Sequence, residues 1–356
     1  MLVQLQYVRA VAALLVVYFH SVLQLQRLDP DALFSGLLFG EKGVDLFFVL
    51  SGFVMWLTTA DKQVSPLQFY RRRIERIVPV YWLFTLAAAF IALVLPSYLK
   101  STIFDLPHML ASLFFIPWTN AADPTGGLIA PVVIPGWTLN YEMYFYLIFG
   151  ALLLLPKNVR ILALGLVLTG LYALFSSSPE GGVIARFYGN PIIFEFLGGV
   201  VLAWLYLGKR LLPAGVAVPL VPLAFAGLVI LDGWHSGLPR LVSAGIPSLL
   251  LIYALVSIDF TKVREFKTLH LIGDASYSLY LSHVFTLVAV RVAYGFLPFD
   301  WMQHELIFIF FCLVGSVIVS LFVYRCFEAP VAGVFRDTRK RQKPAAGISG
   351  GKESAG

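Results

Sequence analysis

The feature that most constrains this chain is its succession of long apolar segments, which recur from Met1 to Phe327. A helix that crosses the hydrocarbon core of a bilayer needs about 20 apolar residues. The 356-residue chain is 59% hydrophobic and 13% charged, whereas about a quarter of the residues of a soluble domain are charged. The sequence therefore predicts an all-α polytopic membrane protein, a bundle of about ten transmembrane helices.

Polar or proline-containing connections separate the apolar segments. The expected spans are Met1–Leu25, Gly43–Thr59, Val78–Leu95, Trp137–Leu155, Ile161–Phe175, Pro191–Leu207, Val216–Leu231, Leu241–Ile258, Ser276–Phe296 and Glu305–Phe327. The connection over residues 97–136 contains five prolines and is long for a structureless loop. We expect it to be partly helical or re-entrant.

The distribution of lysine and arginine predicts the topology. With ten spans, nineteen of these residues fall on one set of loops and the tail, five fall on the other set, and Arg9 and Arg291 lie within spans. Positive residues concentrate on the cytoplasmic side of membrane proteins. Both termini and the loop Asp61–Ile77 are therefore expected in the cytoplasm, and the net charge of +6 indicates topology rather than a nucleic-acid partner.

Domain limits follow from the same pattern. Residues 1–335 are expected to form one integral-membrane domain. Residues 336–356 are basic and rich in Gly, Ala and Ser, which is typical of a disordered cytoplasmic tail. The first apolar run lacks a small-residue cleavage site, so we expect a retained span rather than a signal peptide.

The first span carries two polar residues that are costly inside a bilayer. Arg9 and His20 are eleven residues apart, which is three helical turns plus roughly 20°, so both side chains leave one helix face about 16 Å apart. Such residues are candidates for function by default. A neutral imidazole can act as a general base, and Arg9 could pair with an anionic cofactor that arrives from the cytoplasm. The alternative is that Arg9 is a snorkelling anchor and His20 a packing residue.

Other candidate residues lie near the ends of later spans. Arg73 and Arg76 are neighbours on a helix face and could grip phosphates, although the cluster Arg71–Arg76 also fits a purely topological role. Glu142 has Tyr146 one turn away and is either catalytic or a satisfied structural carboxylate.

Asp45, Tyr146, Tyr280 and His283 are expected to support the substrate or the structure. Asp45 is expected to cap a helix or to bridge two helices. Tyr280 and His283 share a face and could support a substrate or bond between helices. Arg291 is expected to snorkel outward.

Sequence signatures of common cofactor sites do not occur. We find no HExxH, no phosphate-binding GxxxxGK[ST], no GxGxxG after a strand and no GxSxG. No metal site and no permanently bound cofactor are expected. Cys312 and Cys326 lie about 21 Å apart on one helix, too far for a disulfide.

Several separated motifs together resemble acyltransferase family 3, bacterial membrane enzymes that O-acylate sugars. The resemblance covers Leu5 to about Pro330. It depends on Arg9 with His20, on GVDLFFVLSGF from Gly43, RRRIERIVPVYW from Arg71, WTLNYEMYFY from Trp137, GDASYSLYLSH from Gly273 and FEAP from Phe327. The opening is most similar to the branch that acetylates exopolysaccharide.

The resemblance implies roles for individual residues. His20 resembles the catalytic histidine, with Arg9 as its partner on the same helix. Arg73 and Arg76 match the pair implicated in handling the acyl-CoA donor. Glu142 matches a glutamate that we assign as catalytic.

The expected function is therefore transfer of an acyl group, most simply acetyl, from acyl-CoA to a hydroxyl of a cell-surface or secreted polysaccharide. The acceptor is a glycan or a lipid-linked saccharide, and the location is the bacterial inner membrane. A proton-coupled secondary transporter is the alternative, because intramembrane Arg, His and Glu also suit transport. The sequence leaves open the acceptor sugar, the acyl chain, direct transfer against an acyl-histidine relay, and the oligomeric state.

Overall fold

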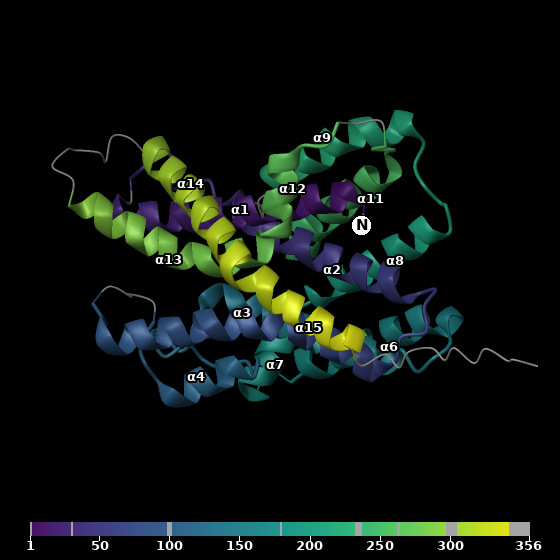
Figure 1. Ribbon diagram of the computed structural model, residues 1–356, viewed down its shortest axis with the longest axis horizontal. Helices are drawn as coiled ribbons and strands as arrows, with labels where there is room; N and C mark the ends of the chain where they lie inside the picture. The colour runs from purple at the N-terminus through teal and green to yellow at the C-terminus, as the bar shows by residue number, and fades with distance from the viewer. Residues whose placement is uncertain are drawn as a thin grey trace, which may run out of the picture.

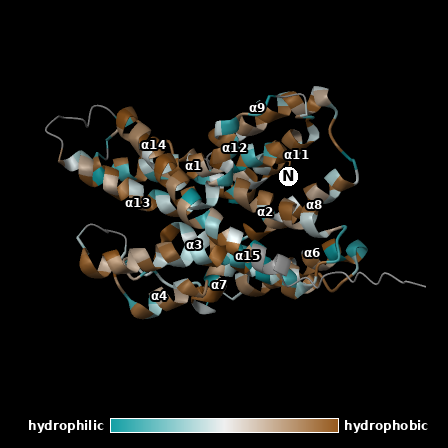
Figure 2. Cartoon of the chain, viewed as in Figure 1, coloured by the Kyte–Doolittle hydropathy of each residue, from teal (hydrophilic) through white to brown (hydrophobic). Residues whose placement is uncertain are grey.

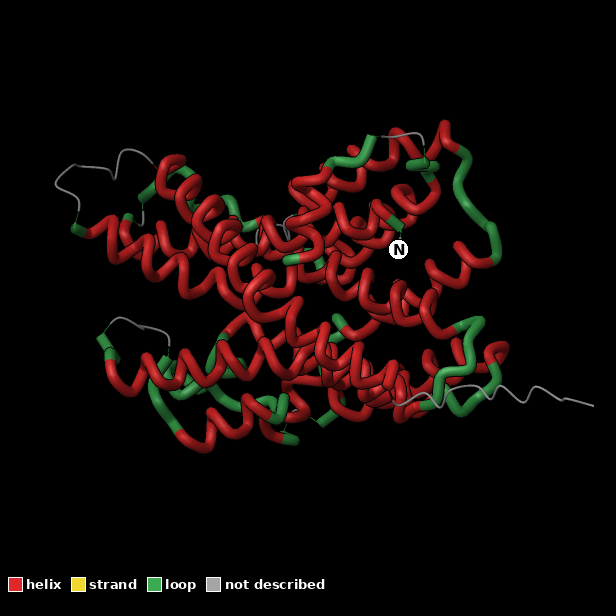
Figure 3. The backbone as a smooth tube through the Cα atoms, viewed as in Figure 1, coloured by secondary structure: helices red, strands yellow, loops and turns green. Residues whose placement is uncertain are grey.

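The computed structural model of the protein describes residues 2–29, 31–97, 102–178, 180–231, 237–261, 264–296 and 305–341. These residues form helices joined by short connections, with no β-strand among them (Figure 3). Extended backbone pairs at one isolated bridge, between Thr119 and Ile129. The expected all-α fold is confirmed.

The helices follow one another along the whole described chain. The α-helices are α1 (Val3–Leu28), α2 (Gly43–Thr59), α3 (Pro66–Val94), α4 (Leu106–Leu113), α5 (Trp137–Leu152), α6 (Lys157–Ser176), α7 (Gly182–Tyr188), α8 (Ile193–Leu207), α9 (Ala214–Ile230), α11 (Ile246–Ser257), α12 (Lys267–Asp274), α13 (Ser276–Gly295), α14 (Glu305–Val323) and α15 (Ala329–Arg341). Shorter turns are 3₁₀-helical at η1 (Phe39–Lys42) and η2 (Ile134–Gly136), and π-helical at η3 (Leu241–Gly245) and η5 (Tyr324–Glu328).

Seven of the described helical segments are long and apolar enough to cross a membrane, and two shorter apolar helices accompany them. The shorter two are Ala214–Ile230 and Leu241–Ser257, and α5 occupies the fourth expected span. The segments agree with the predicted spans to within a few residues at most ends. They support a polytopic membrane protein, while the count of ten stays a prediction.

The basic cluster corrects one expectation. Arg71–Arg76 was expected in a loop, but α3 begins at Pro66 and carries the whole cluster on its first turns. Ser65 caps this helix by accepting a hydrogen bond of 3.3 Å from the Gln68 backbone N–H, and proline is favoured at the first helical position. Helix geometry therefore fixes which arginines face the protein.

The proline-rich connection is partly ordered by its own polar groups, as expected. It contains α4 and a turn in which the Asp123 carboxylate accepts hydrogen bonds from the backbone N–H groups of Leu128 and Thr125. These hydrogen bonds, with that of the Thr125 hydroxyl, lower the pKa of Asp123. His108 of α4 is buried and bonded to the Ala130 carbonyl at 2.8 Å. Within this connection, residues 98–101 lie outside the described residues.

In Figure 1, α1, α2, α3 and α13 run roughly along the long axis of the molecule, and α14 crosses α1 and α13 before α15 continues over α3. The packing of α2 on α8 is very close. A Cβ on Gly52 would lie 1.9 Å from the Phe196 carbonyl oxygen, and a Cβ on Gly199 would lie 1.9 Å from that of Val49. Small residues allow such close approach between membrane helices.

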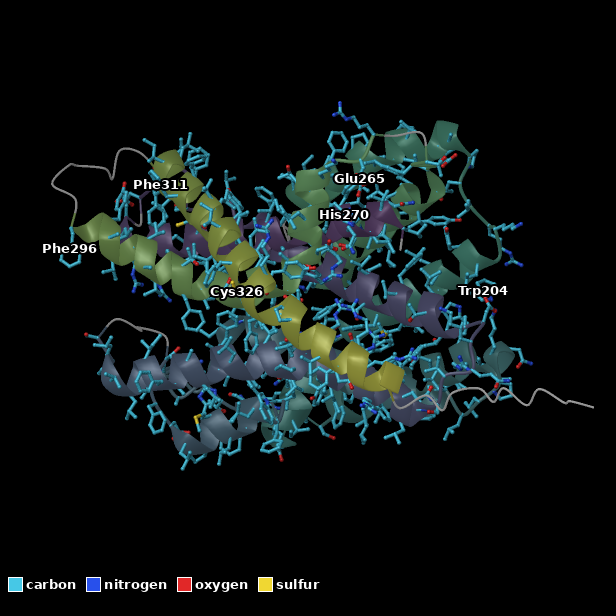
Figure 4. All side chains as sticks on the ribbon, viewed as in Figure 1. Trp204, Glu265, His270, Phe296, Phe311 and Cys326 are labelled. Carbon is cyan, nitrogen blue, oxygen red and sulfur yellow. The ribbon has the colours of Figure 1, made fainter. Side chains whose placement is uncertain are left out.

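Many large hydrophobic side chains are exposed on the bundle, as a surface that faces lipid requires. Hydrophobic residues dominate the outer faces of α9 and α14, whereas hydrophilic ones concentrate on α12 and α15 (Figure 2). Trp204, Phe296 and Phe311 are exposed and point outward from the bundle (Figure 4).

The tail is described only in part. Helix α15 extends through residues 336–341, which were expected to be disordered, and residues 342–356 lie outside the described part of the chain.

Candidate active site

A cavity open to solvent, with about 730 Å³ of empty space including that opening, lies where α1, α2, α3, α5 and α13 meet. One side is apolar and comes mainly from α2, whose contributing residues include Phe47, Phe48, Val54 and Met55. The polar wall consists of Arg9, Ser51, Arg76, Thr138, Glu142, Tyr146, Ser276, Tyr277 and Tyr280. Five of the nine residues singled out from the sequence therefore line one cavity. We call it the central cavity.

Arg9 and His20 both face α13, as expected for one face of α1. Arg9 Nε donates a hydrogen bond of 3.1 Å to the Ser276 hydroxyl at the start of α13. His20 contacts His283, two turns further along α13, with Nε2 of His283 3.3 Å from Nδ1 of His20. Arg9 reaches the cavity wall, whereas His20 is not part of it.

The two arginines of the basic cluster occupy different positions. Arg76 is exposed and lines the central cavity. Arg73 instead packs its guanidinium carbon 5.6 Å from the ring centre of Tyr146 and 5.4 Å from that of Phe69. This is cation–π geometry. Arg73 therefore acts on the cavity through Tyr146.

Glu142 is the acceptor of a small hydroxyl network on the cavity wall. Its Oε1 accepts a hydrogen bond of 3.0 Å from the Ser51 hydroxyl and another from the Tyr146 hydroxyl. Ser51 and Tyr146 also lie 3.2 Å apart. The carboxylate contacts these two groups and not His20, so the structure does not bring Glu142 and His20 together.

Tyr280 stands between the central cavity and the histidines. Its hydroxyl donates to the Pro135 carbonyl at 2.8 Å and lies 2.8 Å from the Thr138 hydroxyl. Its ring centre lies 5.8 Å from that of Phe47 on the cavity side and 6.2 Å from that of His283 on the other. Hydrogen bonds to Pro135 and Thr138 thus hold the Tyr280 ring between Phe47 and His283.

Asp45 lies apart from the central cavity, in a buried cluster of charges. Arg240 donates to both of its carboxylate oxygens and to Glu41. Glu195 of α8 is fully buried beside this cluster. Asp45 therefore joins α2 to the segment before η3, which fits the interhelical role weighed from the sequence.

Arg291 departs from expectation. It was expected to snorkel outward, but it is buried and its Nη1 donates a hydrogen bond of 2.8 Å to Gln24 of α1. A buried partner on a neighbouring helix satisfies its donors better than an apolar lipid surface does.

Sequence reasoning missed several residues of these networks. Ser51 and Ser276 are short hydroxyls whose partners cannot be read from one sequence. Glu195 had a usable signal, because a carboxylate inside an apolar span is a candidate by default. Glu328 also had a usable signal, because it lies in the FEAP motif. Its carboxylate accepts a hydrogen bond from the Ser278 hydroxyl.

Among the described residues, no group of three or more His, Cys, Asp or Glu side chains is arranged to hold a metal ion.

Comparison with known proteins places the chain among acyltransferases. A family model described as an acyltransferase domain matches residues 2–325. The exopolysaccharide production protein ExoZ of Rhizobium meliloti is 37% identical over 71% of this chain and 78% of its own length.

Two more distant relatives are transferases by name. Peptidoglycan O-acetyltransferase OatA of Listeria monocytogenes is 28% identical over 68% of this chain and 44% of its own length. Acyltransferase MdmB of Streptomyces mycarofaciens is 27% identical over 68% of this chain and 67% of its own length. No solved structure matches the chain.

Proposed function

Because this chain belongs to the acyltransferase 3 family and is an acyltransferase, we propose that it moves an acyl group, most simply acetyl, from acyl-CoA to a polysaccharide hydroxyl. The polysaccharide is at the cell surface or secreted, and the acceptor is the glycan itself or a lipid-linked precursor. The names of the relatives support O-acetylation and an exopolysaccharide acceptor.

The central cavity carries this proposal, because it combines an apolar side with two guanidinium groups. The exposed Arg76 and the wall residue Arg9 suit the phosphates of CoA, since guanidinium groups bind phosphate through paired hydrogen bonds. The apolar surface of α2 suits the pantetheine arm.

His20 is proposed as the general base. It accepts the proton of the acceptor hydroxyl as the hydroxyl oxygen attacks the thioester carbonyl carbon, the carbon–sulfur bond breaks, and the proton then passes to the leaving thiolate. Arg9 and His20 share the α1 face that meets α13. In this proposal, a donor held at Arg9 extends its thioester along that face, past Tyr280, to His20.

Glu142 and Arg73 shape the cavity wall in this account. Glu142 accepts hydrogen bonds from the hydroxyls of Ser51 and Tyr146 and so fixes them on the cavity wall, and Arg73 supports the Tyr146 ring. We keep Glu142 as a candidate catalytic group through this network, because its carboxylate lines the cavity itself.

The proposed setting is the bacterial inner membrane, with both termini in the cytoplasm. Arg76, near the start of α3, then meets acyl-CoA where it is made. We propose residues 1–335 as the catalytic membrane domain. The family match supports an enzyme over the proton-coupled transporter.

The experiment that tests the function compares polysaccharide ester content, by NMR, in cells with the gene, without it, and with a His20→Gln variant. The proposal expects O-acetyl signals to disappear in the last two. A parallel assay measures CoA released from acetyl-CoA by the purified protein. Unchanged ester content without the gene would contradict a polysaccharide acceptor, and absence of CoA release with any acceptor would contradict the donor.

A further inference from the structure

We propose that His283 is a positioning residue that accepts a hydrogen bond from Nδ1–H of His20 and keeps Nε2 of His20 as the basic nitrogen. The inference deepens the proposed function and rests on it. It gives a task to a fully buried imidazole that the transfer reaction does not otherwise need.

Backbone carbonyls settle which ring nitrogens carry protons. Nδ1 of His20 lies 2.9 Å from the Val16 carbonyl oxygen, and Nδ1 of His283 lies 3.2 Å from the Leu279 carbonyl oxygen. A carbonyl oxygen only accepts, so each Nδ1 is the donor of its ring, and each neutral ring then keeps its lone pair on Nε2.

The hydrogen bond between the rings of His20 and His283 then has one possible donor. Nε2 of His283 carries a lone pair and lies 3.3 Å from the Nδ1–H of His20, so that hydrogen is shared between Val16 and His283. Nε2 of His20 makes no hydrogen bond with any side chain or backbone group in the described part of the chain. It is free to face the acceptor hydroxyl.

This arrangement matches what a base needs during transfer. When His20 takes a proton at Nε2 it becomes an imidazolium, and its Nδ1–H then faces two acceptors. Both acceptors are neutral, so the charge is stabilised without a second charge inside the membrane. In serine hydrolases a carboxylate orients the histidine in the same way. Here the orienting group is another imidazole.

The kinetic test compares His283→Gln with His283→Leu in purified protein. A glutamine oxygen can reach the position of the imidazole Nε2 and accept the hydrogen bond, whereas leucine fills the space without an acceptor. We expect His283→Leu to lower kcat by about one to two decades, as for losing a hydrogen bond to a charged group. We expect His283→Gln to recover at least a third of wild-type kcat, with the acetyl-CoA KM within about twofold in both.

A packing role predicts the opposite order, because leucine suits a buried apolar site better than glutamine does. Equal losses in the two variants, or a loss confined to KM, would overturn the proposal. His108 provides the matched control, since it is also a buried histidine bonded to a backbone carbonyl. His108→Leu should leave kcat per folded molecule unchanged.

A double variant separates positioning from general damage. If His283 acts through His20, adding His283→Leu to His20→Gln causes no further loss of kcat. A further tenfold loss would mean that His283 acts independently and would contradict the inference.

The tautomer of His20 can be measured by NMR without any assay of acyl transfer. In protein labelled with ¹³C-histidine, the imidazole resonance that disappears in His20→Gln belongs to His20. We expect its shifts to report the Nδ1–H tautomer in the wild type. The Nε2–H tautomer would overturn the inference even in an active enzyme, whereas Nδ1–H in a protein that transfers nothing would contradict only the proposed function.

Discussion

Arg240 and Asp45 are 195 residues apart in the chain, yet Nε and Nη2 of Arg240 donate hydrogen bonds of 3.0 and 2.8 Å to the two carboxylate oxygens of Asp45. The Asp45 side chain is completely buried, and that of Arg240 is 29% exposed. Two parallel N–H···O bonds make the strongest form of this pair. The pair ties α2 to the segment that precedes η3.

We expect Arg240→Gln to destabilise the protein by about 3 kcal/mol, because it leaves the buried Asp45 charge without its partner. Thermal unfolding in detergent measures the change, and Arg264→Gln, at an exposed arginine, is the control. Combining Arg240→Gln with Asp45→Asn should restore part of the loss. A wild-type melting temperature for Arg240→Gln would show that the pair contributes little.

The contact of α2 with α8 predicts a steric effect. Gly52→Ala places a methyl group 1.9 Å from the Phe196 carbonyl oxygen, and overpacking of this kind costs about 1–3 kcal/mol. Gly170→Ala on α6 meets no atom within 4 Å and should be neutral or slightly stabilising. Melting temperatures that fall equally in the two variants would contradict the close packing.

The spans could be predicted because burial in a bilayer leaves a signal in every window of sequence. The expected Gly43–Thr59 has the same bounds as α2. The start of α3 was missed because RRRIER was interpreted through its charge, although Ser65-Pro66 is a helix-start pattern.

The partners of site residues were harder to predict than the residues themselves. Arg9 and His20 follow from helical spacing, which is local. Ser276 and His283, their partners, lie 267 and 263 residues away, and one sequence does not show which distant helices meet. Tyr280 was named, but its place between the cavity and the histidines depends on packing alone.

The two arginines of α3 should differ in their effect on donor use. Arg76→Ala should raise the acetyl-CoA KM by about one to two decades, the cost of losing a charge-assisted contact. Arg73→Ala should raise this KM by less, because Arg73 contacts the cavity wall only through Tyr146. Arg76→Lys should restore the KM only in part. Steady-state kinetics decide this, with Arg72→Ala as the exposed control. An unchanged KM for Arg76→Ala would return this residue to a topological role.

The proposed topology predicts the labelling of single cysteines, after Cys312 and Cys326 are replaced. A cysteine at Ser65 should resist an impermeant reagent added to intact cells, whereas one at Thr125 should react, because the positive residues assign these segments to opposite sides. Both positions should react after the cells are opened. Labelling at Ser65 in intact cells would contradict the proposed orientation.

Direct transfer and an acyl-histidine relay leave different traces. A relay places the acyl group on an imidazole nitrogen first, so protein incubated with radiolabelled acetyl-CoA and no acceptor would keep the label, and His20→Ala would lose it. We expect direct transfer, with no label on the wild-type protein after denaturation. Stable label that depends on His20 would establish the relay instead.

The most direct test of the account measures acetyl transfer from acetyl-CoA to the acceptor polysaccharide by purified wild-type protein and His20→Gln, at matched folded concentrations. Removal of a positioned general base costs about two to four decades in rate. The account predicts that His20→Gln retains about a hundredth of wild-type kcat or less, with an unchanged acetyl-CoA KM. Retention of more than about a tenth of wild-type turnover, well above the loss expected for a general base, would contradict the assignment of His20 as the base.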